Sequence, residues 1–145
     1  MRVASVHAFG QEPELLAWRE LEAWAGPRGY LDDSSNHRIF GFNNPNPSEG
    51  SPNYGYDFWI ELGKDEEESG EARIVDFGGG DYAVSRVEVV KDAYDAIPNG
   101  WKRLHRWCED EGLRFGTHQW LEEHLSAPDG KGGFTVDLYM PISMR

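Results

Sequence analysis

Apolar residues recur along two segments with the spacing of one helix face. Residues 18–24 and 101–107 both read W-x-x-L-x-x-W with charged residues in between, and a glycine follows each soon afterwards. Positions i, i+3 and i+6 lie near one face of an α-helix, so each segment predicts an amphipathic helix with a Trp-Leu-Trp stripe. We expect these helices at about 12–25 and 98–111, with all four tryptophans packed in the core.

Short apolar runs predict strands before and after each helix. The predicted strands are 3–9, 38–43 and 56–61 in the first half and 82–87, 120–125 and 136–141 in the second. A further candidate at 72–77 is expected to extend a hairpin that enters the second half through the glycines at 78–80. Each half therefore reads β-α-β-β.

The recurrence of these segments in the same order, about 80 residues apart, predicts an internal duplication. Two short helices cannot bury their tryptophans on each other alone, but both can lie across one face of an antiparallel sheet, as in α+β proteins. We predict a single α+β domain over 1–145 with pseudo-two-fold symmetry. Repeat 1 would occupy about 1–63 and repeat 2 about 72–145, with two helices on one face of the sheet and a concave ligand pocket on the other.

The charge of the chain narrows the choice of partners. Its 145 residues include 26 Asp and Glu against 14 Lys and Arg, a net charge of −12, and no run of Lys or Arg is present. We therefore expect no direct nucleic-acid binding, because phosphate contacts need a basic patch. An acidic protein attracts cations, although the surplus can also serve solubility alone. The sequence lacks both a membrane span and a secretory signal, so we expect a cytoplasmic protein that binds no membrane.

Metal and cofactor chemistry finds little support in the sequence. The single cysteine, Cys108, cannot form an internal disulfide and has no partner spacing for zinc. His118 and His124 flank carboxylates, but their spacing is not HExxH and supplies no tetrahedral set. We predict neither a metal nor a cofactor.

Several sequence pieces, taken in order, resemble the GyrI-like family, also called the bacterial effector-binding domain. Besides the two helices, these pieces are VASVH at 3–7, RIFGFNNP at 38–45, YGYDFW at 54–59, GDYAV at 80–84, WLEEH at 120–124 and the Pro-Ile pair at 141–142. The resemblance covers nearly the whole chain. It implies a domain that binds small molecules, and many members are sensor domains fused to a DNA-binding helix-turn-helix that bind lipophilic cations. The predicted duplication leaves no room for such a module, which puts direct transcriptional regulation in doubt.

The resemblance places a glutamate that points into the pocket at Glu122. Alternation with a period of two agrees with this placement. If Leu121 and Leu125 face the helices, then Trp120, Glu122 and His124 face the concave side.

The same alternation assigns the other strands. Asp57, Trp59 and Tyr139 are left for the pocket, with Phe40 and Phe42 opposite Glu122 from the first half. Trp59, Trp120 and Tyr139 could equally be ordinary packing, and Asp57 a structural hydrogen-bond acceptor. The helix-packing set is Tyr56, Phe58, Ile60, Val136, Leu138 and Met140, with Asp137 left beside Tyr139. The candidate ligand-binding residues are Glu122, Trp59, Trp120, Tyr139, His124, Phe40, Phe42, Asp57 and Tyr56.

An aromatic box with one carboxylate suits a flat cation, because each desolvated ring attracts it by about 0.5–2 kcal/mol. We therefore predict a stand-alone module that binds hydrophobic, aromatic, cationic small molecules. The resemblance also implies two alternatives. The first is a hydrolase of cyclopropane-type electrophiles, with Glu122 as general base and Tyr139 or Tyr56 as proton donor. The second is a protein-interaction module like the gyrase-inhibitory member, with a gyrase-like protein or a separate regulator as partner.

Overall fold

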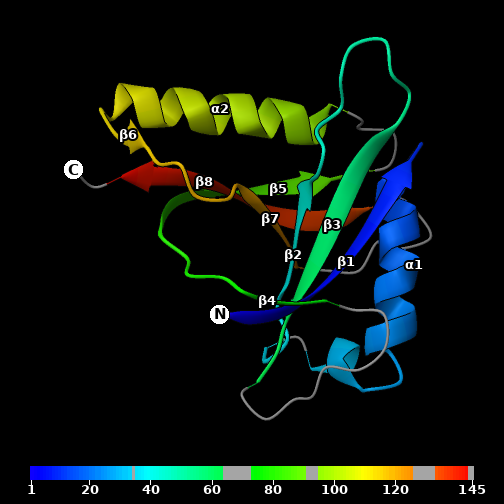
Figure 1. The fold of residues 1–145 in the computed structure, drawn as a ribbon. Coiled ribbons are helices and arrows are strands. Elements are labelled where there is room, and N and C mark those ends of the chain that lie inside the picture. Colours follow the sequence, from blue (N-terminus) through cyan, green and yellow to red (C-terminus); the bar gives the residue numbers. More distant parts are fainter. Residues whose placement is uncertain (34, 64–72, 91–94, 126–132, 144–145) are drawn as a thin grey trace. The chain divides into compact units, whose positions relative to one another are not determined.

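The computed structural model describes residues 1–33, 35–63, 73–90, 95–125 and 133–143. Within these ranges the chain is an α+β protein with two α-helices, one short 3-10 helix and eight strands (Figure 1). The chain divides into two compact units, Met1–Gly78 and Gly79–Arg145, called unit 1 and unit 2 below. The predicted α+β class with two helices and antiparallel strands is confirmed.

Unit 1 is a four-stranded antiparallel sheet with one helix packed on it. Its elements are β1 (Arg2–Gly10), α1 (Pro13–Ala25), the 3-10 helix η1 (Tyr30–Asp32), β2 (Ile39–Asn43), β3 (Tyr54–Glu61) and β4 (Arg73–Asp76). The strand order is β4-β1-β3-β2. α1 lies along β1 and β3 on one face of this sheet (Figure 1).

The core of unit 1 lies between α1 and the two strands that it covers. The strands contribute Ala4, Val6, Ala8, Tyr56, Phe58 and Ile60, and the helix contributes Ala17, Leu21, Trp24 and Ala25. Trp18 packs edge-on against Phe58, with 5.4 Å between the ring centroids. The prediction that Tyr56, Phe58 and Ile60 of β3 pack against the helix is confirmed. Burying each large apolar side chain contributes about 1.5–3 kcal/mol to the stability of the fold.

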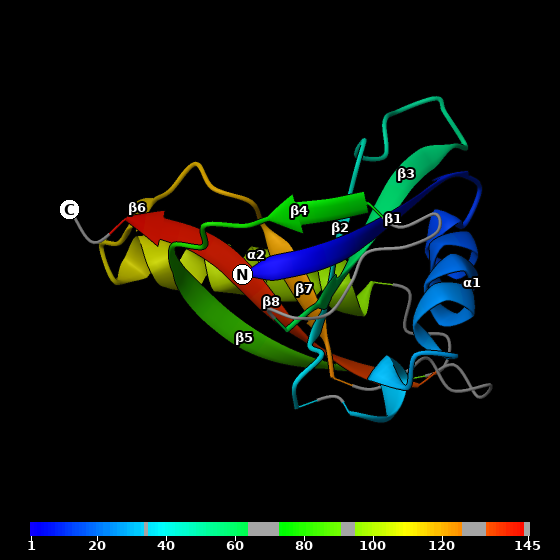
Figure 2. The same ribbon diagram turned by 60° about the horizontal axis from the view of Figure 1, so that its bottom comes forward.

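Unit 2 repeats the order of a strand, a helix and further strands. Its elements are β5 (Asp81–Val89), α2 (Ala96–Asp110), β6 (Arg114–Phe115), β7 (Leu121–His124) and β8 (Phe134–Ser143). β8 lies between β7 and β5, and β6 also pairs with β8. Figure 2 shows α2 running alongside β5 and β8.

Three residues of α2 spaced four apart face the core of unit 2: Gly100, Leu104 and Cys108. A Cβ on Gly100 would lie 2.7 Å from Cγ2 of Val87, so only glycine allows the helix to approach the sheet this closely. The sheet side of the core includes Val87, Val136, Leu138 and Met140. The three residues predicted from β8 are therefore confirmed as helix-packing residues.

The tryptophan stripe predicted for the second helix is only partly buried. Trp107 is 52% exposed, so the prediction that it belongs to the core is wrong. The reason is geometric, because residues at i and i+6 lie about 120° apart around a helix, whereas i and i+4 lie only about 40° apart. The narrower i+4 row of Gly100, Leu104 and Cys108 takes the buried side, and Trp107 falls outside it.

The strand predicted at 72–77 belongs to unit 1. Within it, β4 pairs with β1, whereas β5 pairs with β8, so Gly78–Gly80 does not connect two partners of one hairpin. Both helices begin and end within two residues of their predicted bounds, which is the usual scatter of helix ends. The duplication, the single domain and the concave pocket stay predictions.

Candidate functional site

The register of β7 against β8 determines the face on which each site residue of unit 2 lies. Glu122 pairs with Leu138 and His124 with Val136, and both β8 residues belong to the core under α2. Directly paired residues of antiparallel strands point to the same face. Glu122 and His124 therefore lie on the α2 side, and Glu123 lies on the opposite side. The predicted orientation of Glu122 and His124 is wrong.

Contacts with α2 agree with this register. The indole Nε1 of Trp101 donates a hydrogen bond to Oε2 of Glu122 at 3.4 Å. The rings of Trp101 and Trp120 lie 5.2 Å apart, and Trp120 is 43% exposed. Glu122 and Trp120 thus lie beside the helix, and their ligand-binding roles stay predictions.

The face of unit 2 opposite α2 carries a second carboxylate that the sequence-based assignment passed over. The Tyr139 hydroxyl donates to Oε1 of Glu123 at 2.6 Å, and the ring of Tyr82 lies 5.4 Å from that of Tyr139. Arg86 and Asp137, a cross-strand pair, lie on the same face because Glu123 also pairs with Asp137. We call these five residues, Glu123, Tyr139, Tyr82, Arg86 and Asp137, the Glu123 cluster.

One ion pair lies within the Glu123 cluster. Arg86 binds Asp137 through two contacts, Nε to Oδ1 at 3.0 Å and NH2 to Oδ2 at 3.3 Å. This hydrogen-bonded pairing raises the pKa of Arg86, and the charge of Glu123 adds to the effect. The cluster therefore contains two carboxylates, those of Asp137 and Glu123, and one guanidinium.

The phenol of Tyr82 stays neutral at physiological pH. Desolvation by burial raises the pKa of Tyr82 to about 12, and its hydroxyl donates to the backbone oxygen of Gln119 at 2.5 Å. The cluster therefore presents two neighbouring aromatic rings, those of Tyr82 and Tyr139, together with the carboxylate of Glu123.

His124 also stays neutral near pH 7. Burial lowers the pKa of His124 to about 4, although the negative charge of Glu123 acts in the opposite direction. Part of the residue reaches the surface, but its Nδ1 atom is buried. The imidazole therefore adds no positive charge that would compete with a cationic ligand.

The corresponding face of unit 1, opposite α1, is aromatic. Phe40 pairs with Trp59 and Phe42 with Asp57, so all four point away from the core under α1, as predicted. The ring of Trp59 lies 4.8 Å from that of Phe42 and 5.1 Å from that of Phe77. Another candidate, Tyr56, lies on the α1 side instead and is 2% exposed.

His7 and Asn44 bind Asp57 on this face of unit 1, and neither of these two partners was predicted. His7 Nδ1 hydrogen-bonds Oδ1 of Asp57, and Nδ2 of Asn44 donates to Oδ2 of Asp57 at 3.3 Å. The side chain of Asp57 is 6% exposed and that of His7 is 49% exposed. The three residues line a cavity of about 540 Å³ together with Arg73. Only the β1–β3 register, which pairs His7 with Asp57, identifies them as neighbours.

Two absences apply to the described part of the chain. It contains no group of three or more His, Cys, Asp or Glu side chains placed to hold a metal ion. None of its helices combines the length and the apolar character needed to cross a membrane.

Comparison with known proteins connects this geometry to a family. Residues 1–142 match the family described as Cass2, integron-associated effector binding protein. No curated protein has a significantly similar sequence.

Solved structures share the fold at low sequence identity. An uncharacterized conserved protein from Listeria innocua has a TM-score of 0.61 at 12% identity, over 98% of this chain and 88% of that chain. SAV2435 bound to tetraphenylphosphonium has a TM-score of 0.55 at 10% identity, over 99% and 89%. A hydrolase from Listeria innocua has a TM-score of 0.56 at 15% identity, over 98% and 88%.

Proposed function

Because the chain belongs to the Cass2 family of integron-associated effector binding proteins, we propose that it binds hydrophobic aromatic cations and that Glu123 is their counter-charge. Membership of this family confirms the resemblance to GyrI-like effector-binding domains. The observation that carries the proposal is the hydrogen bond from Tyr139 to Glu123, which holds a nearly buried carboxylate against a tyrosine whose ring lies 5.4 Å from that of Tyr82.

The physical argument rests on the cost of burying charge. Glu123 is 7% exposed, and an ionised carboxylate removed from water is destabilising unless a cation or hydrogen-bond donors compensate for the lost hydration. Tyr139 supplies one donor, and Arg86 is already bound to Asp137. A cationic ligand beside Glu123 would lower this cost further, and ring contacts with Tyr139 and Tyr82 would add about 0.5–2 kcal/mol each.

The ligand of one structural relative supports the chemical class. SAV2435 binds tetraphenylphosphonium, which carries a positive charge inside an apolar aromatic shell. Within unit 1 itself, the aromatic face opposite α1, with Trp59 and Phe42, is proposed as a separate contact surface for ligands of this kind. We propose that the protein binds such molecules in order to sense or sequester them.

Titration with two ions of the same shape tests the proposal. We expect tetraphenylphosphonium to bind saturably in calorimetry, and tetraphenylborate, which reverses the charge, to bind at least about tenfold more weakly. The tryptophan fluorescence of the protein provides an independent readout. Equal affinity for both ions, or binding of neither, would contradict a cation site.

Hydrolysis is a second candidate function, and one observation favours it. Asp57 orients the half-exposed imidazole of His7 at a cavity, which is the arrangement of a general base that activates water. Under this reading, a strained cyclopropane-type electrophile incubated with the protein would be recovered with one water added. Mass spectrometry would detect that product, and the His7→Gln variant should abolish it. An electrophile recovered unchanged leaves binding as the function.

A further inference from the structure

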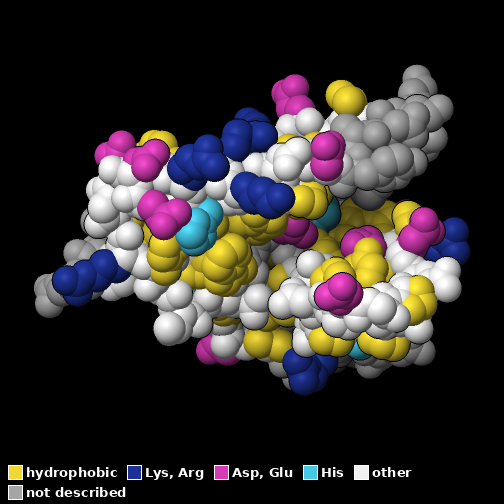
Figure 3. Space-filling model, turned by 90° about the horizontal axis from the view of Figure 1, so that it is seen from above, with side chains coloured by type: hydrophobic (Ala, Val, Ile, Leu, Met, Phe, Trp, Pro, Cys, Tyr) yellow, Lys and Arg dark blue, Asp and Glu magenta, His cyan; other side chains and the backbone are white. Residues whose placement is uncertain are grey.

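The outward face of α2 collects cations in a chain that is acidic overall. Lys102, Arg103 and Arg106 are all exposed on this helix, and Figure 3 shows Lys and Arg side chains gathered over it. The sequence contains no run of Lys or Arg. Helical spacing nevertheless brings these three residues together on one face of α2.

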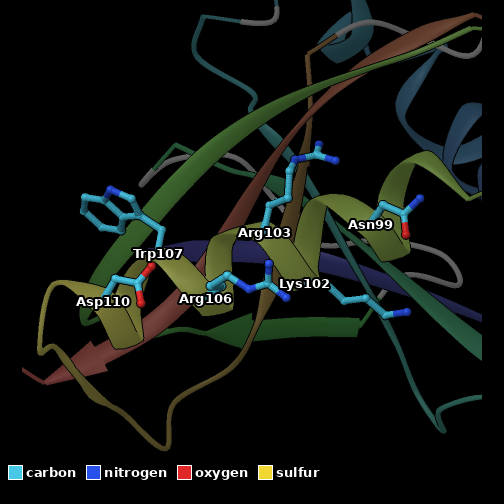
Figure 4. A pocket seen from close by; sticks show the side chains of 6 residues that line it. All are labelled: Asn99, Lys102, Arg103, Arg106, Trp107 and Asp110. Atoms are coloured by element: carbon cyan, nitrogen blue, oxygen red, sulfur yellow. The ribbon is translucent and has the colours of Figure 1, made fainter.

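The three cations border a groove of about 390 Å³ that Asn99, Trp107 and Asp110 complete (Figure 4). Trp107 is 52% exposed, so its large apolar surface lies open beside the guanidinium groups. We call this set, Asn99, Lys102, Arg103, Arg106, Trp107 and Asp110, the α2 groove. Tryptophan and arginine are the residues most enriched where proteins bind one another tightly.

The cations of the α2 groove have no ionic partner within the described residues. The ion pair on this helix joins His105 to Glu109 at 3.0 Å, and neither Lys102 nor the two arginines of the groove lie within ion-pair distance of a described carboxylate. No described carboxylate therefore neutralises their charge. Exposed pairs contribute only about 0.2–1 kcal/mol each, so specificity requires several pairs and an apolar contact together.

We propose that the α2 groove is a docking surface for an acidic peptide segment of a partner protein. Carboxylates of the segment would pair with Lys102, Arg103 and Arg106, and an aliphatic or aromatic side chain would cover the exposed face of Trp107. From Asn99 to Asp110 the groove spans eleven residue steps, or about 16 Å along the helix at 1.5 Å per residue. This length suits about three turns of a helical segment.

Charge at the ends of α2 favours a peptide over a nucleic acid. Asp95 precedes the helix, and Glu109, Asp110 and Glu111 end it, so the basic region is bounded by carboxylates on both sides. A phosphate chain carries charge continuously and would be repelled at both ends, in addition to the repulsion by the net charge of −12. A segment with a few discrete carboxylates can match the central cations alone.

Fluorescence anisotropy with labelled synthetic peptides tests the proposal. The probe is a helical peptide of Glu and Leu residues, and its control replaces each Glu with Lys. We expect the acidic probe to bind at low salt and the basic control not to bind. Arg106→Glu should weaken the acidic probe at least about tenfold by placing like charges together. Trp107→Ala should weaken it several-fold.

A matched control separates the groove from overall charge. Arg19→Glu reverses an exposed arginine on α1, changes the net charge as Arg106→Glu does, and should leave the probe affinity unchanged. Circular dichroism of each variant verifies folding. Tetraphenylphosphonium affinity should be the same in Arg106→Glu, so failure here is distinguishable from failure of the proposed cation site.

Four results would overturn the proposal. They are no binding of the acidic probe, equal binding of both peptides, equal weakening by Arg19→Glu and Arg106→Glu, and tighter binding of oligothymidylate than of the acidic probe. The last would assign the groove to single-stranded nucleic acid. Self-association in sedimentation that Arg106→Glu abolishes would instead assign it to a second copy of the chain.

Discussion

Glu122 and Glu123 are neighbours in the chain, but they point to opposite faces of unit 2. Glu122 lies on the α2 side, where the indole of Trp101 donates a hydrogen bond to it. Glu123 lies on the opposite face, where it accepts a hydrogen bond from Tyr139. A shift of one residue in strand phase exchanges the two faces. The sequence-based assignment took Leu121 as a helix-packing residue because it is apolar. In the structure Leu121 is 2% exposed but pairs with Tyr139, so apolar character alone could not identify its face.

His124 gives a prediction on pH at the same scale. Burial lowers the pKa of His124 to about 4, against about 6.5 in the unfolded chain. The unfolded state therefore binds the proton more readily, and the stability that neutral His124 confers is complete above about pH 6.5 and lost as the pH falls toward 4. We expect this residue to lower the free energy of unfolding by about 3 kcal/mol across that window.

Chemical denaturation at several pH values measures this slope. His124→Gln should remove most of the difference between pH 6.5 and pH 4. His105→Gln, which changes a histidine whose side chain is 46% exposed, is the comparison variant for the loss of an imidazole. An unaltered slope in His124→Gln would show that the imidazole is not desolvated.

At the scale of elements, the hydrophobic pattern predicted both helices and most strands correctly. It located α1 and α2 from their W-x-x-L-x-x-W repeats, and the alternation at 56–61 and 136–141 identified the residues that pack under them. The pattern could not predict cross-strand partners. Neither the pairing of β4 with β1 nor that of His7 with Asp57 is encoded in local spacing, because register depends on the packing of the whole sheet.

The buried side of α2 provides a prediction for this element. Leu104 is 5% exposed and Trp107 is 52% exposed, although the W-x-x-L-x-x-W repeat predicts that both are buried. Leu104→Ala should lower the free energy of unfolding by about 2–5 kcal/mol through lost burial and the cavity left behind. Trp107→Ala should change it by less than about 0.5 kcal/mol. Urea denaturation of both variants tests this, and a larger loss from Trp107→Ala would contradict the observed orientation of α2.

At the scale of the whole molecule, charge is distributed unevenly over an acidic chain. The composition predicts attraction of cations, and the Glu123 cluster is the site that we propose for one. The same composition could not predict the basic α2 groove, because the net charge is a sum over the whole chain and does not show where the charges lie in the fold. The α+β class and the family followed from the order of short motifs along the chain. The choice of Glu123 as the proposed counter-charge could be made only from the register of β7 against β8.

The central claim is that Glu123, and not Glu122, is the counter-charge for a bound cation. Calorimetric titration of tetraphenylphosphonium into Glu123→Gln and Glu122→Gln tests it most directly, since both variants remove one negative charge from adjacent positions of one strand. We predict a loss of affinity of at least about tenfold, or about 1.4 kcal/mol, for Glu123→Gln and less than about twofold for Glu122→Gln. Equal losses, or a larger loss from Glu122→Gln, would contradict the claim.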